Sequence, residues 1–261
     1  MKIWVISKQS LLLAASQLTW TEFTGPKGSV FTTQPTHVMD PAQNTFYFIG
    51  VKNNTSLKIN KIIFKNRVPI WCSVGSVRIR PYPNQMVPQA KQKGSRTRIH
   101  TGDDRMLNAV YRCGRIWATH HVPSNDGKRS EVAWYEINPL KKTVVHQGRI
   151  KNPRRFYYYP SIAVSKKKEV VVGFSASSSK LFAGGYFTGR KRTDPPGTMR
   201  AVSTLKRGRS SYVQLDDNRL NRWGDYSATV SDPNGDSFWT IQEYALAKRK
   251  WGTWWGKVMF K

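Results

Sequence analysis

Short apolar runs separated by polar turns recur along the whole chain and predict β-strands. Four pairs of runs share one pattern, in which a small or apolar strand, a polar turn and an apolar strand follow each other. The pairs read PTHVMDPAQNTFYFIG, RMLNAVYRCGRIWATH, PSIAVSKKKEVVVGFS and YSATVSDPNGDSFWTI. In the last pair Asn234-Gly235 lies between two β-rich runs and predicts a hairpin, because such turns need residues that tolerate positive φ.

The spacing of these pairs predicts the architecture. They begin at Pro35, Arg105, Pro160 and Tyr226, which are 70, 55 and 66 residues apart. Repeats of this size with several strands each are typical of propeller blades. In the first pair the turn is expected at Asp40–Asn44, and Arg67–Lys93 is interpreted as a Pro-, Gln- and Ser-rich connection with one strand at Ser76–Arg80. The longest candidate helix, Ile241–Lys250, is short and has no capping residues. We therefore expect an all-β protein, a β-propeller of four-stranded antiparallel blades with about four to five blades present.

The repeats also suggest how a single domain over residues 1–261 is divided. Blade-like units are expected at 31–100, 101–155, 156–220 and 221–261, with 1–30 as the remnant of an incomplete leading blade. Either the last strands close the ring with this remnant, or the chain is a partial ring of a longer form with about six or seven blades. An open ring would expose unpaired strand edges.

The net charge of +28, from 43 Lys and Arg against 15 Asp and Glu, would attract acidic polymers. The basic residues are scattered among apparent turns, as in solvated loops, whereas nucleic-acid-binding proteins concentrate them on one face. Nucleic acid is therefore a disfavoured partner. A glycan or an acidic polymer is favoured, and a protein partner stays open.

The remaining composition narrows the alternatives. Cys72 and Cys113 lack metal-ligand spacing and are interpreted as buried free thiols, with a single disulfide left open. His120 and His121 are neighbours on a predicted strand, so their side chains would point to opposite faces and could not share one ion. Neither a metal nor another cofactor is expected. No apolar run is long enough for a transmembrane helix.

Polar side chains stand where each inner strand of the propeller would begin. Such positions converge at one end of the central channel and predict a ligand-binding site there. The set is Gln34, Asp103, Asp104, Arg105, Tyr157–Tyr159, Arg222 and Asp225. From this set, together with Arg190, seven residues are predicted to bind a ligand: Asp103, Asp104, Arg105, Tyr159, Arg190, Arg222 and Asp225. A structural alternative is that Asp104, Arg105 and Asp225 tie neighbouring blades together by charge-assisted hydrogen bonds.

Several segments carry a resemblance to a known group of proteins. The most specific is Arg222-Trp-Gly-Asp-Tyr226, and the others are Gln92–Ser95, Thr101–Val110, Trp117–His120, Tyr159–Ala163, Phe238–Trp239 and Glu243–Ala245. Together they resemble bacterial secreted propellers of the sialidase-like, BNR-like group, whose functions are mostly unassigned. The resemblance implies an extracellular or cell-surface location.

Two functions are compatible with these observations. The favoured interpretation is a non-catalytic propeller that binds a glycan or another polyanion. The alternative is a sialidase-like glycosidase, which needs an arginine cluster, a tyrosine activated by a glutamate, and an acid/base aspartate. The candidates for those roles are Arg105, Arg190, Arg222, Tyr159, Tyr226, Glu243 and Asp225. Trp251, Trp254 and Trp255 could stack on sugars, although at least one of them is expected in the core.

Overall fold

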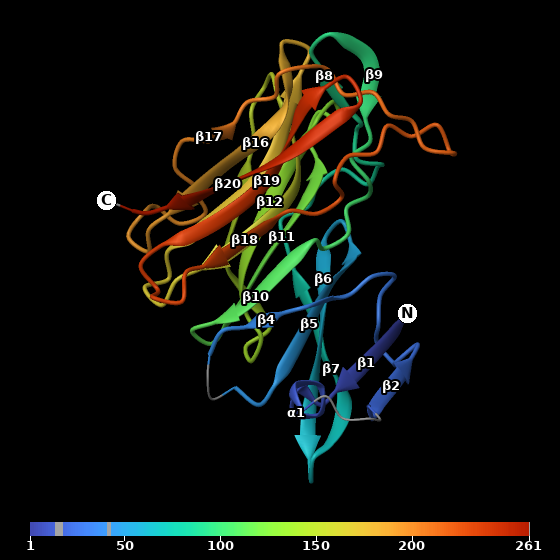
Figure 1. Ribbon diagram of the computed structural model, residues 1–261. Helices are drawn as coiled ribbons and strands as arrows, with labels where there is room; N and C mark the ends of the chain where they lie inside the picture. The colour runs from blue at the N-terminus through green and yellow to red at the C-terminus, as the bar shows by residue number, and fades with distance from the viewer. Residues whose placement is uncertain (14–17, 41–42, 261) are drawn as a thin grey trace.

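The computed structural model describes residues 1–13, 18–40 and 43–260, and its strands form a β-propeller with four blade sheets (Figure 1). The first sheet contains β3 (Gln34–Pro35), β5 (Phe46–Asn53), β6 (Ser56–Lys65) and β7 (Val68–Arg78). The second contains β4 (His37–Val38), β10 (Asn108–Arg112), β11 (Arg115–Pro123), β12 (Ser130–Asn138) and β13 (Thr143–Ile150). The third contains β14 (Phe156–Val164), β15 (Val170–Ser178), β16 (Leu181–Arg190) and β17 (Ser203–Lys206). The fourth contains β18 (Ala228–Ser231), β19 (Phe238–Ala247) and β20 (Lys250–Val258).

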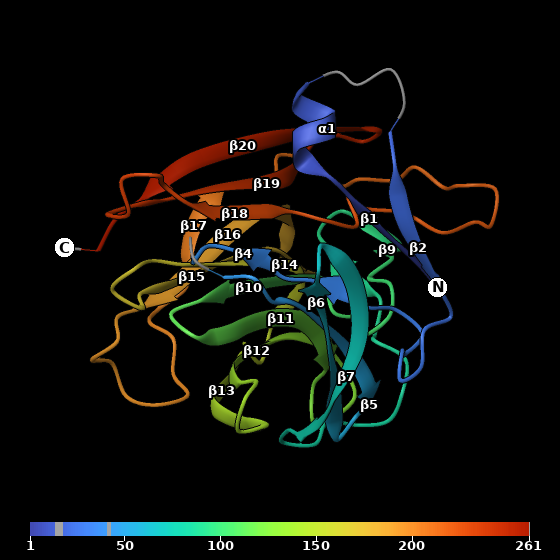
Figure 2. The same ribbon diagram turned by 90° about the horizontal axis from the view of Figure 1, so that it is seen from below.

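Neighbouring blades pack face to face in chain order, which can be followed in the view from below (Figure 2). The first two blades also share a strand connection. β3 pairs antiparallel with β5, the backbone N–H of Thr36 donates to Tyr47, and β4 then pairs parallel with β10. One extended segment therefore joins both sheets at their inner edges.

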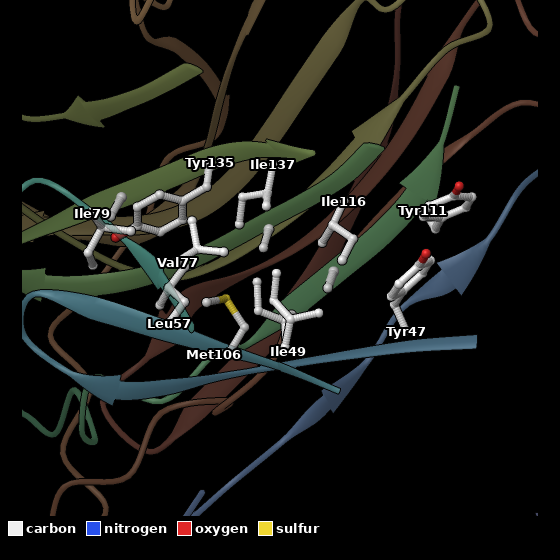
Figure 3. Close-up of a cluster of buried hydrophobic side chains, with 14 of the residues drawn as sticks. Tyr47, Ile49, Leu57, Val77, Ile79, Met106, Tyr111, Ile116, Tyr135 and Ile137 are labelled. Atoms are coloured by element: carbon white, nitrogen blue, oxygen red, sulfur yellow. The ribbon is translucent and has the colours of Figure 1, made fainter. Parts of the chain in front are cut away.

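Alternating apolar positions on facing strands build the core between blades. Tyr47 of the first blade stacks on Tyr111 of the second with ring centroids 5.1 Å apart, and Ile49 and Leu57 are fully buried in the same cluster (Figure 3). Between the second and third blades, Trp117 and Trp134 belong to a second buried cluster. Its other members include Ile162, Val172 and Phe174. These interfaces fix the positions of the inner strands.

Two hairpins lie outside the blade sheets. β1 (Lys2–Ile6) pairs with β2 (Trp20–Thr24), and β8 (Ala90–Gln92) pairs with β9 (Ser95–Ile99). Phe23 of β2 approaches Trp71 of the first blade, with ring centroids 6.3 Å apart. The division of the chain into the expected blade-like units stays a prediction.

The structure differs from the sequence expectations in three elements. Residues 67–93 were expected to be a connection with one strand at Ser76–Arg80, but β7 covers Val68–Arg78 and β8 follows. β7 is an outer, half-exposed strand, so its apolar alternation is weak. A short helix, α1 (Lys8–Leu12), begins after Ser7, where none was expected. As expected, Ile241–Lys250 is not a helix, because β19 continues to Ala247 and a turn leads into β20. The turn expected at Asp40–Asn44 includes Pro41 and Ala42, which lie outside the described residues.

Candidate active site

Two neighbouring hollows gather most of the predicted site residues. The first, here called the site hollow, has a volume of about 350 Å³. Its polar lining includes Asp103, Arg105, Tyr159, Arg222 and Asp225, which are five of the seven residues predicted to bind a ligand. They come from the loop before β10, from β14 and from the loop before β18, and the structure brings them together in one hollow. That they bind a ligand stays a prediction.

Asp103 and Arg105 form a fixed ion pair in the site hollow. The Arg105 guanidinium donates from Nε to Asp103 Oδ1 at 2.7 Å and from Nη2 to Oδ2 at 2.6 Å. This hydrogen-bonded guanidinium holds the pKa of Asp103 below its usual value, so Asp103 is ionised at neutral pH. Such two-pronged pairs fix orientation as well as charge.

Arg222 and Asp225 form a second ion pair three residues apart in the loop before β18. Nη2 of Arg222 donates to Oδ2 of Asp225, and this contact raises the pKa of Arg222. Both side chains are about half exposed, so the pair stays open to a ligand. Tyr226 follows directly and is 64% exposed at the rim.

Tyr159 has an uncommon backbone conformation for a bulky residue, with a φ of +49°. It lies in an irregularity of the β14–β15 pairing. Its N–H donates to Nδ1 of His121 at 3.1 Å, and its hydroxyl donates to the carbonyl of His100 at 3.1 Å. Strained residues that neighbours hold in place cluster at functional sites. Burial and the nearby Asp225 raise the pKa of Tyr159, so its hydroxyl keeps its proton, which disfavours the nucleophilic role of a sialidase tyrosine.

Glu243 on β19 lines the second hollow, here called the tryptophan hollow, which has a volume of about 850 Å³. Both hollows include Arg222, Asp225 and Tyr226, so they adjoin at this loop. Oε2 of Glu243 accepts a hydrogen bond of 2.7 Å from the N–H of Gly224. Burial, together with the charge of Asp225, raises the pKa of Glu243 to about 7 despite that bond.

An exposed aromatic ring accompanies Glu243. In the β19–β20 register Glu243 faces Thr253. Trp251 lies two residues before Thr253 on the same face of β20. Trp251 is 55% exposed, and it lines the tryptophan hollow with the buried Trp223. The expectation that at least one of the three tryptophans lies in the core is wrong, because Trp254 and Trp255 are also exposed. The reason is that β20 is the outer strand of the fourth blade, and no other sheet of the described residues fully covers it there.

The structure places two of the predicted ligand-binding residues elsewhere. The Asp104 carboxylate accepts a bond of 2.5 Å from the Tyr82 hydroxyl, and its carbonyl accepts one from His120, so it supports the interior beside the hollow. Arg190 is buried on β16, where its guanidinium lies 5.5 Å from the Trp134 ring centroid and donates to the carbonyl of Asp194. It lies on an outer part of the third blade and does not line the site hollow.

Two other predicted polar residues, Gln34 and Tyr158, make hydrogen bonds within the fold and do not line the site hollow. The Gln34 amide donates to the neighbouring carbonyl of Pro35, and the Tyr158 hydroxyl donates to Ser177. Cys72 and Cys113 are free and half-buried, rather than fully buried as expected.

The two adjacent histidines point to opposite faces of β11. Nε2 of His120 contacts the Tyr135 hydroxyl, whereas His121 accepts from Tyr159 and lines the site hollow. Burial lowers the pKa of each histidine to about 4. Within the described ranges, no group of three or more metal-binding side chains comes together. No helix of the described residues is long and apolar enough to cross a membrane.

Sequence reasoning missed three contributors to these hollows. His100 and Met86 line the site hollow from the segment around the β8–β9 hairpin, and Gly224 contacts Glu243. Only Gly224 had a usable signal, since a glycine between Trp223 and Asp225 suggests close approach of another group.

Comparison with known proteins identifies fold relatives only. No protein-family model and no curated protein matches the chain. Among solved structures, it is similar to the GH43 endo-arabinanase from Bacillus licheniformis, with 12% identity, 86% of this chain and 72% of that chain covered, and a TM-score of 0.37. The α-L-arabinofuranosidase Arb93A from Fusarium graminearum has 10% identity, coverages of 92% and 81%, and a TM-score of 0.44. The endo-arabinase from Bacteroides thetaiotaomicron has 11% identity, coverages of 90% and 95%, and a TM-score of 0.33.

This finding corrects the favoured functional interpretation. These solved structures are glycoside hydrolases, not sialidases, so the prediction of a non-catalytic propeller is contradicted. The chemistry of this chain has to come from its own residues in the two hollows.

Proposed function

We propose that this protein is a glycoside hydrolase in which Glu243 is the general acid. The observation that carries the proposal is that Glu243 and Asp225 line the same open hollow, where burial raises the pKa of Glu243 to about 7. A protonated and an ionised carboxyl flanking one open site are the pair that hydrolysis of a glycosidic bond requires.

The reaction balances with these two groups and one water. Glu243 transfers its proton to the glycosidic oxygen while the bond from that oxygen to the anomeric carbon breaks. A water adds to the anomeric carbon and gives its proton to the Asp225 carboxylate. The products are a sugar with a free anomeric hydroxyl and an alcohol, and solvent returns the carboxyls to their starting protonation.

The surrounding residues have matching roles in this proposal. Trp251 offers an exposed ring on which a sugar can stack, since ligand sites commonly use aromatic walls. Arg222 forms an ion pair with Asp225, and the pair of Asp103 and Arg105 offers hydrogen-bond partners for sugar hydroxyls in the site hollow. The resemblance to secreted propellers supports an extracellular location for the activity.

The test is release of reducing ends from a polysaccharide panel that includes arabinan and polygalacturonate. Wild-type protein would be compared with Glu243→Gln and Asp225→Asn. Asp236→Asn is the matched control, because Asp236 is an exposed carboxylate on the β18–β19 turn that forms an ion pair with Lys167 and lines neither the site hollow nor the tryptophan hollow. We expect turnover in the wild type and the control and its loss in both site variants. Equal turnover in Glu243→Gln would overturn the proposal.

A further inference from the structure

A third hollow, here called the basic hollow, is lined by cations rather than carboxylates. It has a volume of about 430 Å³, and five of its ten lining residues are basic: Lys91, Arg98, Lys128, Arg129 and Arg154. Arg129 pairs with Asp126 at 2.5 Å. In the described part of the chain, the other four have no ion-pair partner, so their charge is available to a ligand.

These cations come from three separate segments, the β8–β9 hairpin, the β11–β12 turn and the loop before β14. In the hairpin, Lys91 and Arg98 are each next in sequence to the paired residues Ala90 and Ile99, beside an irregularity of the strand register, and both line the hollow. Like charges gathered around one hollow repel each other. Their convergence with cations from two other loops therefore suggests an anionic ligand that offsets this repulsion.

The backbone that carries these cations is fixed. The Gln85 amide donates to the carbonyl of Gly127 at 2.9 Å, and Ser177 Oγ donates to the carbonyl of Lys91 at 2.8 Å. Buried Phe156 lines the hollow with Pro88 and Pro153. A fixed array of cations loses less entropy on binding than a mobile one.

The basic hollow and the site hollow are lined by the same two segments of the chain, residues 86–88 and 98–100. Met86 and His100 line the site hollow, whereas Pro88 and Arg98, each two residues away in sequence, line the basic hollow. Thr101 Oγ1 donates to the carbonyl of Pro88 at 3.1 Å and joins the two segments. A polymer bound in one hollow can therefore continue into the other at the end of the molecule that carries the β8–β9 hairpin (Figure 1).

We infer that the basic hollow binds the carboxylate or sulfate groups of an acidic polysaccharide that extends into the site hollow. That this polysaccharide is also the substrate rests on the glycoside hydrolase function proposed above. Single-stranded nucleic acid is disfavoured as the occupant, because its bases need exposed aromatic rings, and Phe156, which is the aromatic residue of this lining, is buried.

The experiment measures binding by fluorescence anisotropy at about 0.15 M salt, where the Debye length of about 8 Å screens distant charges. Four labelled probes are compared: an oligogalacturonate, a sulfated oligosaccharide, a neutral arabino-oligosaccharide and a single-stranded DNA. The basic-hollow variant combines Lys91→Gln, Arg98→Gln, Lys128→Gln and Arg154→Gln. The control combines Lys65→Gln, Arg67→Gln, Lys141→Gln and Lys166→Gln, which remove the same charge from turns at the opposite strand ends.

We expect one acidic oligosaccharide to bind more tightly than the neutral one. Its affinity should fall by about tenfold or more in the basic-hollow variant, and by less than about twofold in the control. The control cations lie at the opposite ends of strands such as β12 and β14, whose nine residues span about 30 Å, several times the screening length. The carboxylated and sulfated probes distinguish the two sources of negative charge. Equal losses in both variants would overturn the inference, since net charge alone would then act, and so would tighter binding of the DNA through the same cations.

The two proposals fail in different ways. Binding without hydrolysis of any acidic polymer would reject the enzymatic proposal and retain the anion site. Hydrolysis of a neutral polymer, without preferential binding of an acidic probe, would reject the anion site and retain the enzyme.

Discussion

The backbone N–H of Gly224 donates a hydrogen bond of 2.7 Å to Oε2 of Glu243. This bond joins the loop before β18 to the middle of β19 and sets the position of the carboxyl. A Cβ atom on Gly224 would overlap that carboxylate. Only glycine therefore allows the loop to approach Glu243 so closely.

The substitution Gly224→Ala should displace the Glu243 carboxyl and lower kcat by about 100-fold, since small misplacements of a reacting group have effects of that size. Gly256→Ala is the control, because its Cβ would meet only the flexible end of Leu205. Steady-state kinetics and thermal unfolding would be measured on both. A Gly224→Ala protein with wild-type kcat would show that this contact does not position the acid.

The free energy of unfolding should depend on pH, because Glu243 is a largely buried acid. A pKa raised from 4.5 to about 7 means that folding favours the protonated form of Glu243. This contribution is present below pH 4.5 and is lost as the pH rises through 7. Glu243→Gln should then be more stable than wild type by up to about 3 kcal/mol at pH 8, with little difference at pH 4. Urea unfolding at both pH values tests this, and a stability difference that does not change with pH would contradict it.

The two buried histidines should make the protein more stable as the pH rises, which is opposite to the effect of Glu243. Burial lowers the pKa of His120 and His121 from 6.5 to about 4, so the unfolded chain binds more protons between these values. Their contribution is present above pH 6.5 and is lost as the pH falls through 4, at about 3 kcal/mol for each histidine. Urea unfolding of the Glu243→Gln protein, which lacks the opposing carboxyl, should show stability rising steeply with pH across this window. A flat profile would mean that the histidines are not buried in neutral form.

Two arginines predicted to share a site should differ in their effects. Arg222→Gln removes the partner of Asp225 and should lower kcat by about tenfold or more, with little change in stability. Arg190→Gln removes a buried cation beside Trp134 and should lower the free energy of unfolding by about 1–3 kcal/mol, with unchanged kcat/KM. Kinetics and urea unfolding of both variants separate the roles, and a loss of activity in a folded Arg190→Gln protein would contradict this assignment.

The sequence predicted the propeller and much of the site because both follow from local patterns. Pairs of apolar runs joined by a polar turn, such as the one at Asn234-Gly235, repeat at blade spacing, and polar residues at the starts of inner strands converge by topology. Arg190 was misplaced because sequence does not show that its strand lies toward the outside of a blade. The edge strand β7 was largely missed, since half-exposed strands carry little apolar alternation.

The pKa and contacts of the site residues depend on packing between distant segments, which local sequence patterns do not show. Glu243 was only one of several candidate carboxylates, and its raised pKa comes from burial under the loop at Gly224. The basic hollow also required the structure, because its cations lie in three segments that look like solvated turns when read separately.

The most direct test of the account is the pH dependence of kcat on a polysaccharide that the wild type hydrolyses. A general acid with a pKa of about 7 predicts that kcat falls above neutral pH. In Glu243→Gln this alkaline fall should disappear, and kcat should drop by about 10²–10⁴-fold, with a smaller loss on an aryl glycoside whose leaving group needs no proton. An unchanged alkaline limb in the Glu243→Gln protein would contradict the assignment of Glu243 as the acid.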